Sequence, residues 1–251
     1  MTLFSRLMGR IAKLPPAETF DVITEHDLNV PMPDGAILLA NRYAPRGVEK
    51  PPLILVRSCY GRVGLLGLLY GRIFAERGFQ VLIQSTRGTF GSTGPFEPLV
   101  HERNDGLATV EWLKQQSWFP GSFGTMGLSY LGFVQWAIAP DVPELKAMSI
   151  QVSSAEFRNP IYSGEAFSLE IALTWIHLMA NQEHTNLLKQ ILFPASRTLR
   201  AIFPHLPLRE SDTLTGSCAT YQPAHLDQEG LSVCNTHQEV SLFAIDATRK
   251  R

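Results

Sequence analysis

The sequence predicts an α/β protein in which a mostly parallel sheet carries helices on both faces. Two short apolar segments, LILVR at 53–57 and FQVLIQS at 79–85, have the length and composition of buried strands. Segments with helical spacing lie between and after them, and strands that alternate with helices are typical of parallel sheets. Of the 251 residues, 45% are hydrophobic and 18% charged, so the chain is long and apolar enough to bury a core.

The first expected element is a short amphipathic helix. The segment MTLFSRLMGRIAKLPP alternates apolar groups with three basic residues and ends at Pro15 and Pro16, which stop a helix. We expect it to pack on the domain or on a partner; peripheral contact with a membrane is the alternative. The basic residues leave no uninterrupted apolar core of signal-peptide length, so secretion is disfavoured. No run of about 18 apolar residues occurs in the sequence, so no membrane span is predicted.

A hairpin and a parallel unit are expected next. Residues 27–45 alternate in polarity on both sides of a Pro-Asp-Gly turn at 33–35, which predicts a hairpin. Helical spacing over 65–77 ends at Gly78, a typical residue after a helix. This helix connects the two buried strands, and a strand, a helix and a strand in that order form a parallel unit.

The same alternation continues up to residue 152. After a Gly-rich loop, residues 102–116 have helical spacing, and FGTMGLS at 123–129 predicts a strand that runs into a turn. A helix over 130–139 is stopped by Pro140, and KAMSIQV at 146–152 predicts a further strand. These elements extend the parallel sheet.

The alternation stops after this strand. From 160 to about 205 helical stretches follow one another, and an all-helical insertion of this kind is expected to form a lid over the strand ends where a substrate binds. The remaining residues lose all periodicity. The predicted parts are an N-terminal amphipathic segment at 1–19, a core at 20–155, a partial helical cap at 156–215 and an aperiodic tail at 216–251.

Charge and cysteine content exclude several classes of function. The formal net charge is −1, which gives no general reason to bind nucleic acid. Cys59, Cys218 and Cys234 are too few and too scattered for a disulfide framework or a zinc site, so a reducing compartment and a cytoplasmic location are expected. No cofactor or metal is predicted.

The strongest chemical motif is GLSYLG at 127–132, where a strand should turn into a helix. A nucleophile at such a sharp turn requires small flanking residues, and Ser129 would lie at its tip, with the helix N-terminus beside a developing oxyanion. In the usual motif a glycine lies two residues after the serine. Here that residue is Leu131, and the glycine is Gly132. The alternative interpretation is an ordinary serine near a strand end.

Four segments with matching order and spacing decide between these interpretations. They are SCYGR at 58–62, STRGTFGSTGPF at 85–96, DGLATVEWLKQQSWFPGSFGTMG at 105–127 and SYLGFVQWAIA at 129–139. Together they resemble the α/β-hydrolases of the cocaine esterase and X-prolyl dipeptidyl-peptidase group over about residues 20–215. The resemblance implies a three-layer α/β-hydrolase sheet with a partial helical cap, and it implies that the C-terminal strands of the family fold are missing from this chain.

The resemblance also implies a chemistry. Members of the group hydrolyse esters or amides through an acyl-enzyme, and the nucleophile position matches Ser129. The oxyanion hole of the group corresponds to the hydroxyl of Tyr60 and the backbone amide of Tyr130. Cys59 and Ser85 stand where the group more often has Pro and Asp, and neither change affects a reacting group.

Two other residues in these motifs have alternative interpretations. Arg87 with its neighbouring glycines suggests a phosphate site, but neither GxGxxG nor GxxxxGK[ST] is present, so we interpret the loop as a structural turn. Cys59 lacks an evident activating partner, which favours a packing role over a reactive thiol.

The base and acid of a catalytic triad are not identified. In this fold they follow the nucleophile on loops after two further strands, which the sequence does not predict. The histidines after Ser129 are His177, His184, His205, His225 and His237. The first three belong to the expected lid, and we interpret the last two, with Asp227 and Asp246, as surface residues of the tail.

Three functional hypotheses follow. The first is a serine hydrolase that acts on a small ester, an amide or a prolyl peptide. The alternative is a truncated or frameshifted hydrolase that is catalytically incomplete and acts at most as a noncatalytic binding protein. Nucleotide binding is disfavoured because the first strand-to-helix turn lacks a dinucleotide fingerprint.

Overall fold

The structure of this chain is a computed structural model that describes residues 3–17, 21–157, 161–163, 166–183 and 199. The chain divides into two compact units. The first unit comprises residues 1–94 and 101–155, and the second comprises residues 95–100 and 156–251. The predicted tail at 216–251 and most of the predicted cap lie outside the described residues.

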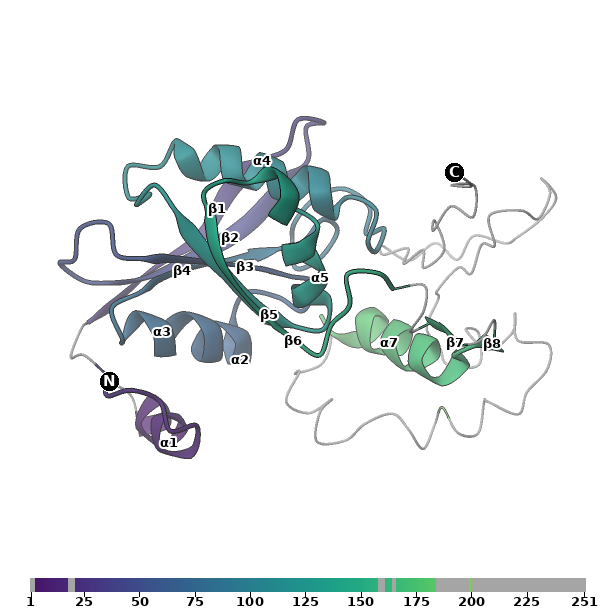
Figure 1. Ribbon diagram of the computed structural model, residues 1–251, viewed down its shortest axis with the longest axis horizontal. Coiled ribbons are helices and arrows are strands. Elements are labelled where there is room, and N and C mark those ends of the chain that lie inside the picture. The colour runs from purple at the N-terminus through teal and green to yellow at the C-terminus, as the bar shows by residue number, and fades with distance from the viewer. Residues whose placement is uncertain (1–2, 18–20, 158–160, 164–165, 184–198, 200–251) are drawn as a thin grey trace. The chain divides into compact units, whose positions relative to one another are not determined.

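The first unit is built on a six-stranded mixed sheet with the strand order β1-β2-β4-β3-β5-β6 (Figure 1). The four strands β4, β3, β5 and β6 are parallel, whereas β1 and β2 form the predicted antiparallel hairpin at one edge. The predicted α/β class with a mostly parallel sheet is therefore confirmed. The strands are β1 (Val22–Pro31), β2 (Ile37–Pro45), β3 (Leu53–Ser58), β4 (Gln80–Ser85), β5 (Phe123–Leu128) and β6 (Leu145–Gln151).

The helices of this unit lie close to their predicted positions. They are α1 (Leu3–Ile11), α2 (Gly64–Leu66), η1 (Gly67–Arg72), α3 (Ile73–Ala75), α4 (Glu102–Lys114), α5 (Tyr130–Trp136) and the short 3₁₀ turn η2 (Ala139–Asp141). The predicted helix at 130–139 thus ends three residues early, because the chain tightens into η2 at Pro140.

The predicted helix at 65–77 is a continuous helical segment with a π-helical centre, η1. Its glycines explain the local geometry. A Cβ atom on Gly67 would lie 2.3 Å from the Tyr43 hydroxyl, and one on Gly71 would lie 2.5 Å from the Tyr43 ring. Only glycine allows the helix to pass this closely over β2.

Helices cover both faces of the sheet. On one face, α4 packs Val110 and Leu113 against a buried cluster. The helices α2 and α3 lie on the opposite side (Figure 1). The strand residues of the α4 cluster include Val30, Leu38, Ala40, Leu53, Leu55, Leu82 and Phe123.

The described part of the second unit corrects one prediction. The expected all-helical insertion contains a small antiparallel hairpin, β7 (Tyr162–Ser163) and β8 (Ala166–Phe167), before helix α7 (Leu169–Asn181). The Tyr162 and Phe167 rings contact each other across this hairpin, with centroids 5.4 Å apart, so aromatic pairing stabilises strands where helical spacing had predicted a helix. The helical stretches expected after residue 183, up to about residue 205, lie outside the described residues except for Leu199.

Candidate active site

Ser129 occupies a sharp turn between β5 and α5. Its backbone has φ 56° and ψ −123°. This conformation is uncommon for residues other than glycine and costs about 1–3 kcal/mol. Backbone hydrogen bonds hold it on both sides: the Ser129 N–H donates to the Gln151 carbonyl at 2.9 Å, and the Ser129 carbonyl accepts from the N–H groups of Gly132 at 2.8 Å and Phe133 at 3.4 Å. The strained turn is therefore fixed on one side by β6 and on the other by the first turn of α5.

Glycines on both sides of Ser129 allow this turn. A Cβ atom on Gly127 would lie 2.3 Å from Cβ of Leu131, and a Cβ atom on Gly132 would lie 2.4 Å from Cβ of Ser153. Leu131 is buried and packs over Gly127, so a side chain fits where the usual motif has its second glycine. The close approach to the chain after β6 occurs one residue later, at Gly132.

Tyr60 lies in the loop after β3, at the same edge of the sheet as Ser129, because β3 and β5 are parallel neighbours. Its backbone N–H donates to the Ser58 hydroxyl at 3.0 Å, and its side chain is partly exposed. Gly61 follows with φ 96°, directly against the Phe90 ring, which comes from the loop after β4. The loop therefore has a fixed backbone from its first residues.

Arg62 ties this loop to its neighbours. Its guanidinium donates to the Ser85 hydroxyl at 3.1 Å and to the Phe90 carbonyl at 2.5 Å, and it forms an ion pair with Asp27. The Arg62 hydrogen bond lowers the pKa of the Asp27 carboxyl. Ser85, one of the two departures from the resembled group, thus serves as a buried acceptor for Arg62.

Tyr130 follows Ser129 and is held by a buried carboxylate. Its hydroxyl donates to Glu102 Oε1 at 2.6 Å. The other carboxylate oxygen of Glu102, Oε2, forms an ion pair with Arg57 Nη2 at 2.9 Å, without the geometry of a hydrogen bond. The side chain of Glu102 is 5% exposed and that of Arg57 is 1% exposed. Arg57 also donates from Nη1 to the Glu102 carbonyl at 2.7 Å. Contacts in the protein interior therefore fix the Tyr130 side chain. They also hold the backbone of Tyr130, which provides the first N–H of α5.

Sequence reasoning missed Arg57 and Glu102. Arg57 ends a strand that was expected to be buried and apolar, and its Nε donates to Gln84 Oε1 at 3.0 Å on the neighbouring strand β4. Gln84 in turn donates to the Thr109 hydroxyl on α4 at 2.9 Å. A charged residue inside an otherwise apolar strand is a signal that a partner of opposite charge must lie close by.

Cys59 is fully buried beside this network. Burial raises the pKa of its thiol well above the usual value, the negative charge of Glu102 raises it further, and a hydrogen bond with Tyr60 opposes the shift. The thiol is therefore protonated near neutral pH and is a poor nucleophile, which supports the predicted packing role.

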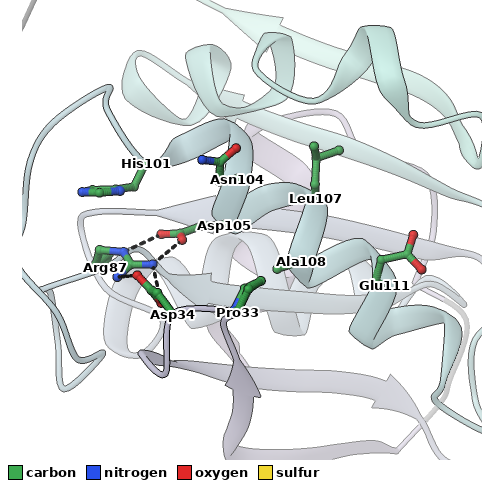
Figure 2. Close-up of a pocket in the computed structure, with 9 residues that line it drawn as sticks. All are labelled: Pro33, Asp34, Arg87, His101, Asn104, Asp105, Leu107, Ala108 and Glu111. Atoms are coloured by element: carbon green, nitrogen blue, oxygen red, sulfur yellow. Dashed lines mark hydrogen bonds and ion pairs between the residues drawn. The ribbon is translucent and has the colours of Figure 1, made fainter.

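Arg87, the residue that suggested a phosphate site, is saturated by two carboxylates (Figure 2). It donates from Nε and Nη2 to Asp105 at 3.0 and 2.6 Å, and from Nη1 and Nη2 to Asp34 at 2.7 and 3.3 Å. These bonds lower the pKa of the Asp34 carboxyl. This pairing supports the structural interpretation of the loop, since no donor-rich face remains for a phosphate.

A cavity of about 420 Å³ lies beside this cluster (Figure 2). Its lining contains neither Ser129 nor Tyr60 nor Tyr130, so it is separate from the serine turn. It is lined by Pro33, Asp34, Arg87, His101, Asn104, Asp105, Leu107, Ala108 and Glu111.

Among the described residues, no hydrogen bond joins the Ser129 side chain to a histidine. His26 shares a contact of 3.1 Å with the Asn41 amide, and His177 lies on α7, where burial lowers its pKa. The other candidates for base and acid, His184, His205, His225, His237, Asp227 and Asp246, lie outside the described residues. In the part of the chain that is described, no cluster of side chains suits a metal ion, and no helix is long and apolar enough to cross a bilayer.

A mostly parallel sheet with helices on both faces and a serine at a left-handed turn between strand and helix defines an α/β hydrolase. Comparison with known proteins specifies the family. The family model described as X-Pro dipeptidyl-peptidase (S15 family) matches residues 34–215. The chain therefore belongs to this family of hydrolases.

Individual proteins are similar to parts of this chain. Cocaine esterase from Rhodococcus sp. (strain MB1 Bresler) is 37% identical over 157 residues, which are 60% of this chain and 27% of that enzyme. A CocE/NonD family hydrolase from Staphylococcus aureus is 30% identical, with a TM-score of 0.46 over 51% of this chain and 27% of the other. An aminopeptidase from a marine sediment archaeon, Thaumarchaeota archaeon, shares the fold, with 23% identity and a TM-score of 0.54 over 66% and 31% of the two chains. The chain thus spans about a quarter to a third of the length of these relatives.

Proposed function

We propose that this chain carries the nucleophile and oxyanion hole of a serine hydrolase that cleaves ester or amide bonds through an acyl-enzyme on Ser129. The observation that carries the proposal is the backbone of Ser129, φ 56° and ψ −123°, at the junction of β5 and α5. A strained turn of this kind exposes the serine hydroxyl at the carboxyl edge of the sheet, where it meets a substrate carbonyl.

The proposed reaction proceeds in two steps. The Ser129 hydroxyl attacks the substrate carbonyl carbon and passes its proton to a histidine, which then gives it to the leaving alcohol or amine as the acyl-enzyme forms. Water, deprotonated by the same histidine, attacks the acyl carbon. The bond to Ser129 Oγ then breaks, the histidine returns the proton to this oxygen, and the acid is released. The sequence does not identify that histidine. Turnover that depends on Ser129 would show that His225 or His237 completes the triad, against their interpretation as surface residues of the tail.

The proposed oxyanion hole consists of the Tyr60 hydroxyl and the Tyr130 backbone N–H. Both come from the carboxyl ends of the parallel neighbours β3 and β5, so they approach the same substrate oxygen from adjacent strands. The N–H groups in the first turn of a helix also provide a partial positive charge, which stabilises a developing oxyanion. The buried bond of the Tyr130 hydroxyl to Glu102 would keep this amide in place during both steps.

The names of the relatives suggest the substrate class. One relative is named a cocaine esterase, and the matching family model is named for an X-Pro dipeptidyl-peptidase. We therefore propose a small ester, an amide or a prolyl peptide as substrate. With three cysteines and no disulfide framework in the sequence, a cytoplasmic location fits this proposal.

A fluorophosphonate probe tests the proposal directly, because it reacts covalently with an activated serine. If a histidine of the chain serves as base, we expect the 251-residue chain to be labelled and Ser129→Ala to lose the label. The matched control is Ser149→Ala, an exposed serine on β6, which should leave labelling unchanged.

The outcomes separate the two hypotheses. Label that persists in Ser129→Ala would overturn the assignment of the nucleophile. A folded chain that takes no label at all would favour the alternative, a catalytically incomplete hydrolase that acts at most as a noncatalytic binding protein.

A further inference from the structure

Helix α1 is strongly amphipathic, with its small, apolar and basic residues on different sides. At about 100° per residue, Leu7 and Ile11 lie on one side of the helix, whereas Ser5 and Gly9 lie on another. Arg6 and Arg10 lie beside the apolar side. An amphipathic helix on the surface of a domain normally turns its apolar side towards the core.

In the structure, α1 instead turns its small residues towards the core. Ser5 is fully buried, and its hydroxyl hydrogen-bonds to the buried carboxylate of Glu76, which follows α3. Gly9 packs against Arg77, the residue after Glu76. A Cβ atom on Gly9 would lie 3.0 Å from Arg77 Nη2. Arg77 also donates to the Pro15 carbonyl at 2.9 Å, beyond the end of the helix. The helix therefore contacts the core through its small residues.

The apolar side of α1 consequently faces away from the core. The side chains of Leu7 and Ile11 are 55% and 66% exposed, and they lie one helical turn apart. Each would lose exposed apolar area if another surface covered it, and the removal of apolar area from water favours binding. The contact to the core is polar and specific, so it fixes this orientation.

The charge of the segment indicates what covers it. Residues 1–17 contain three basic side chains and no Asp or Glu, and Arg6, Arg10 and Lys13 are all exposed. A second copy of this chain would bring six positive charges together, which disfavours pairing of two such helices. An anionic lipid surface complements both the charge and the apolar side.

We infer that α1 is an interfacial helix that attaches the protein to anionic membrane surfaces. Its nine residues span about 13.5 Å at 1.5 Å per residue, which is less than half the thickness of the hydrocarbon core of a bilayer. The helix therefore lies in the interface, with Leu7 and Ile11 among the acyl chains and the basic side chains at the phosphates. This inference does not depend on the proposed hydrolase activity.

Cosedimentation of the full 251-residue chain with vesicles tests the inference. At low salt we expect binding to vesicles of phosphatidylcholine with 30% phosphatidylserine, and at least tenfold weaker binding to pure phosphatidylcholine. The double variant Leu7→Ser/Ile11→Ser should weaken binding about tenfold or more. Two equally exposed apolar residues outside α1 provide the matched control, since Val63→Ser/Ile171→Ser should bind as the unmodified chain does.

Charge is tested separately with Arg6→Gln/Arg10→Gln, which alters only exposed side chains and leaves the Ser5 contact intact. This variant should bind about tenfold more weakly at low salt, and high salt should remove most of the difference, because each basic residue near an anionic surface contributes to binding and salt screens that contribution. If circular dichroism shows that Leu7→Ser/Ile11→Ser is not folded, vesicle binding by Arg6→Gln/Arg10→Gln and its salt dependence test the inference instead.

Three results would overturn the inference. They are no binding to anionic vesicles at low salt, equal binding to both vesicle types, and binding that the variants of α1 do not change. Dimers that dissociate in Leu7→Ser/Ile11→Ser, without vesicle binding, would assign the apolar side to a second copy of the chain instead.

Discussion

Removing the Glu102 carboxylate should destabilise the core severely. The substitution Glu102→Ala leaves the Arg57 guanidinium without its ion-pair partner at a position where its side chain is 1% exposed. Breaking a buried pair in this way costs about 3–5 kcal/mol. The Tyr130 hydroxyl loses its acceptor in the same substitution. Because the free energy of unfolding of a domain is only about 5–15 kcal/mol, the variant should be close to the limit of folding.

Two milder variants separate these contributions. Tyr130→Phe removes only the hydrogen bond to a charged group and should cost about 1.5–3 kcal/mol. Glu111→Ala breaks an exposed ion pair of 2.8 Å with Lys114 on the same helix and should change the free energy of unfolding very little, because solvent screens the pair. The order of destabilisation is therefore Glu102→Ala, then Tyr130→Phe, then Glu111→Ala.

Thermal unfolding followed by circular dichroism measures this order. For a chain of this size 1 kcal/mol corresponds to about 2–4 °C in melting temperature, so Glu102→Ala should melt about 6–20 °C lower than the unmodified chain. Adding Tyr130→Phe to Glu102→Ala should cost little more, because the partner of the hydroxyl is already gone. A decrease of less than about 2 °C for Glu102→Ala would refute the assignment of this pair as a buried, stabilising contact.

Three further predictions concern the site. Gly132→Ala should lower the free energy of unfolding by about 1–3 kcal/mol, because the added Cβ atom overpacks the site. Adding Ser153→Gly should restore part of this loss, since it removes the Cβ atom 2.4 Å away. Urea denaturation measures both variants, and a double variant no more stable than Gly132→Ala would contradict the steric argument. Cys59 should resist iodoacetamide at pH 8 in the native chain and react in urea, as read by peptide mass spectrometry. Its raised pKa keeps the thiol neutral, so burial of Cys59 is favourable below the pKa of the unfolded thiol and becomes costly as the pH rises above it. Tyr60→Phe should lower kcat about 100-fold with little change in KM wherever turnover depends on Ser129; an effect on KM alone would limit Tyr60 to shaping the pocket.

The sequence predicted the sheet and the serine turn because both depend on local signals. Apolar strands such as 53–57 and 79–85 are short, continuous and bounded by turn residues, and the motif around Ser129 combines a strand, small residues and a helix within a few positions. The helix predicted at 65–77 ended close to its predicted boundary: α3 ends at Ala75, and the chain leaves the helical conformation at Gly78, where φ is 87°. The helix at 130–139 was extended too far, because spacing alone does not distinguish an α-helix from the 3₁₀ turn that follows it.

The errors and omissions have a different origin. The hairpin of β7 and β8 replaces the start of a predicted helix, because pairing of Tyr162 with Phe167 is a contact between segments that helical spacing does not describe. The partnership of Arg57 with Glu102 joins residues 45 positions apart, so periodicity could not reveal it. The exposed apolar side of α1 was likewise hidden, since spacing shows that a helix is amphipathic and does not show which side contacts the core.

The contact between Glu102 and Arg57 also explains how a strained serine turn is compatible with a stable core. Arg57 is the penultimate residue of β3, which leads directly to Tyr60, and Glu102 begins α4. The same carboxylate accepts the hydroxyl of Tyr130, the residue after Ser129. One buried acid thus connects the elements that carry both proposed donors of the oxyanion hole and the proposed nucleophile. Groups that are fixed in this way do not need to reorganise when charge develops on a substrate, which is the condition under which oxyanion donors are most effective. On this basis we propose that the described core holds the proposed nucleophile and oxyanion donors in place, and that the proton-transferring histidine and its orienting acid come from elsewhere.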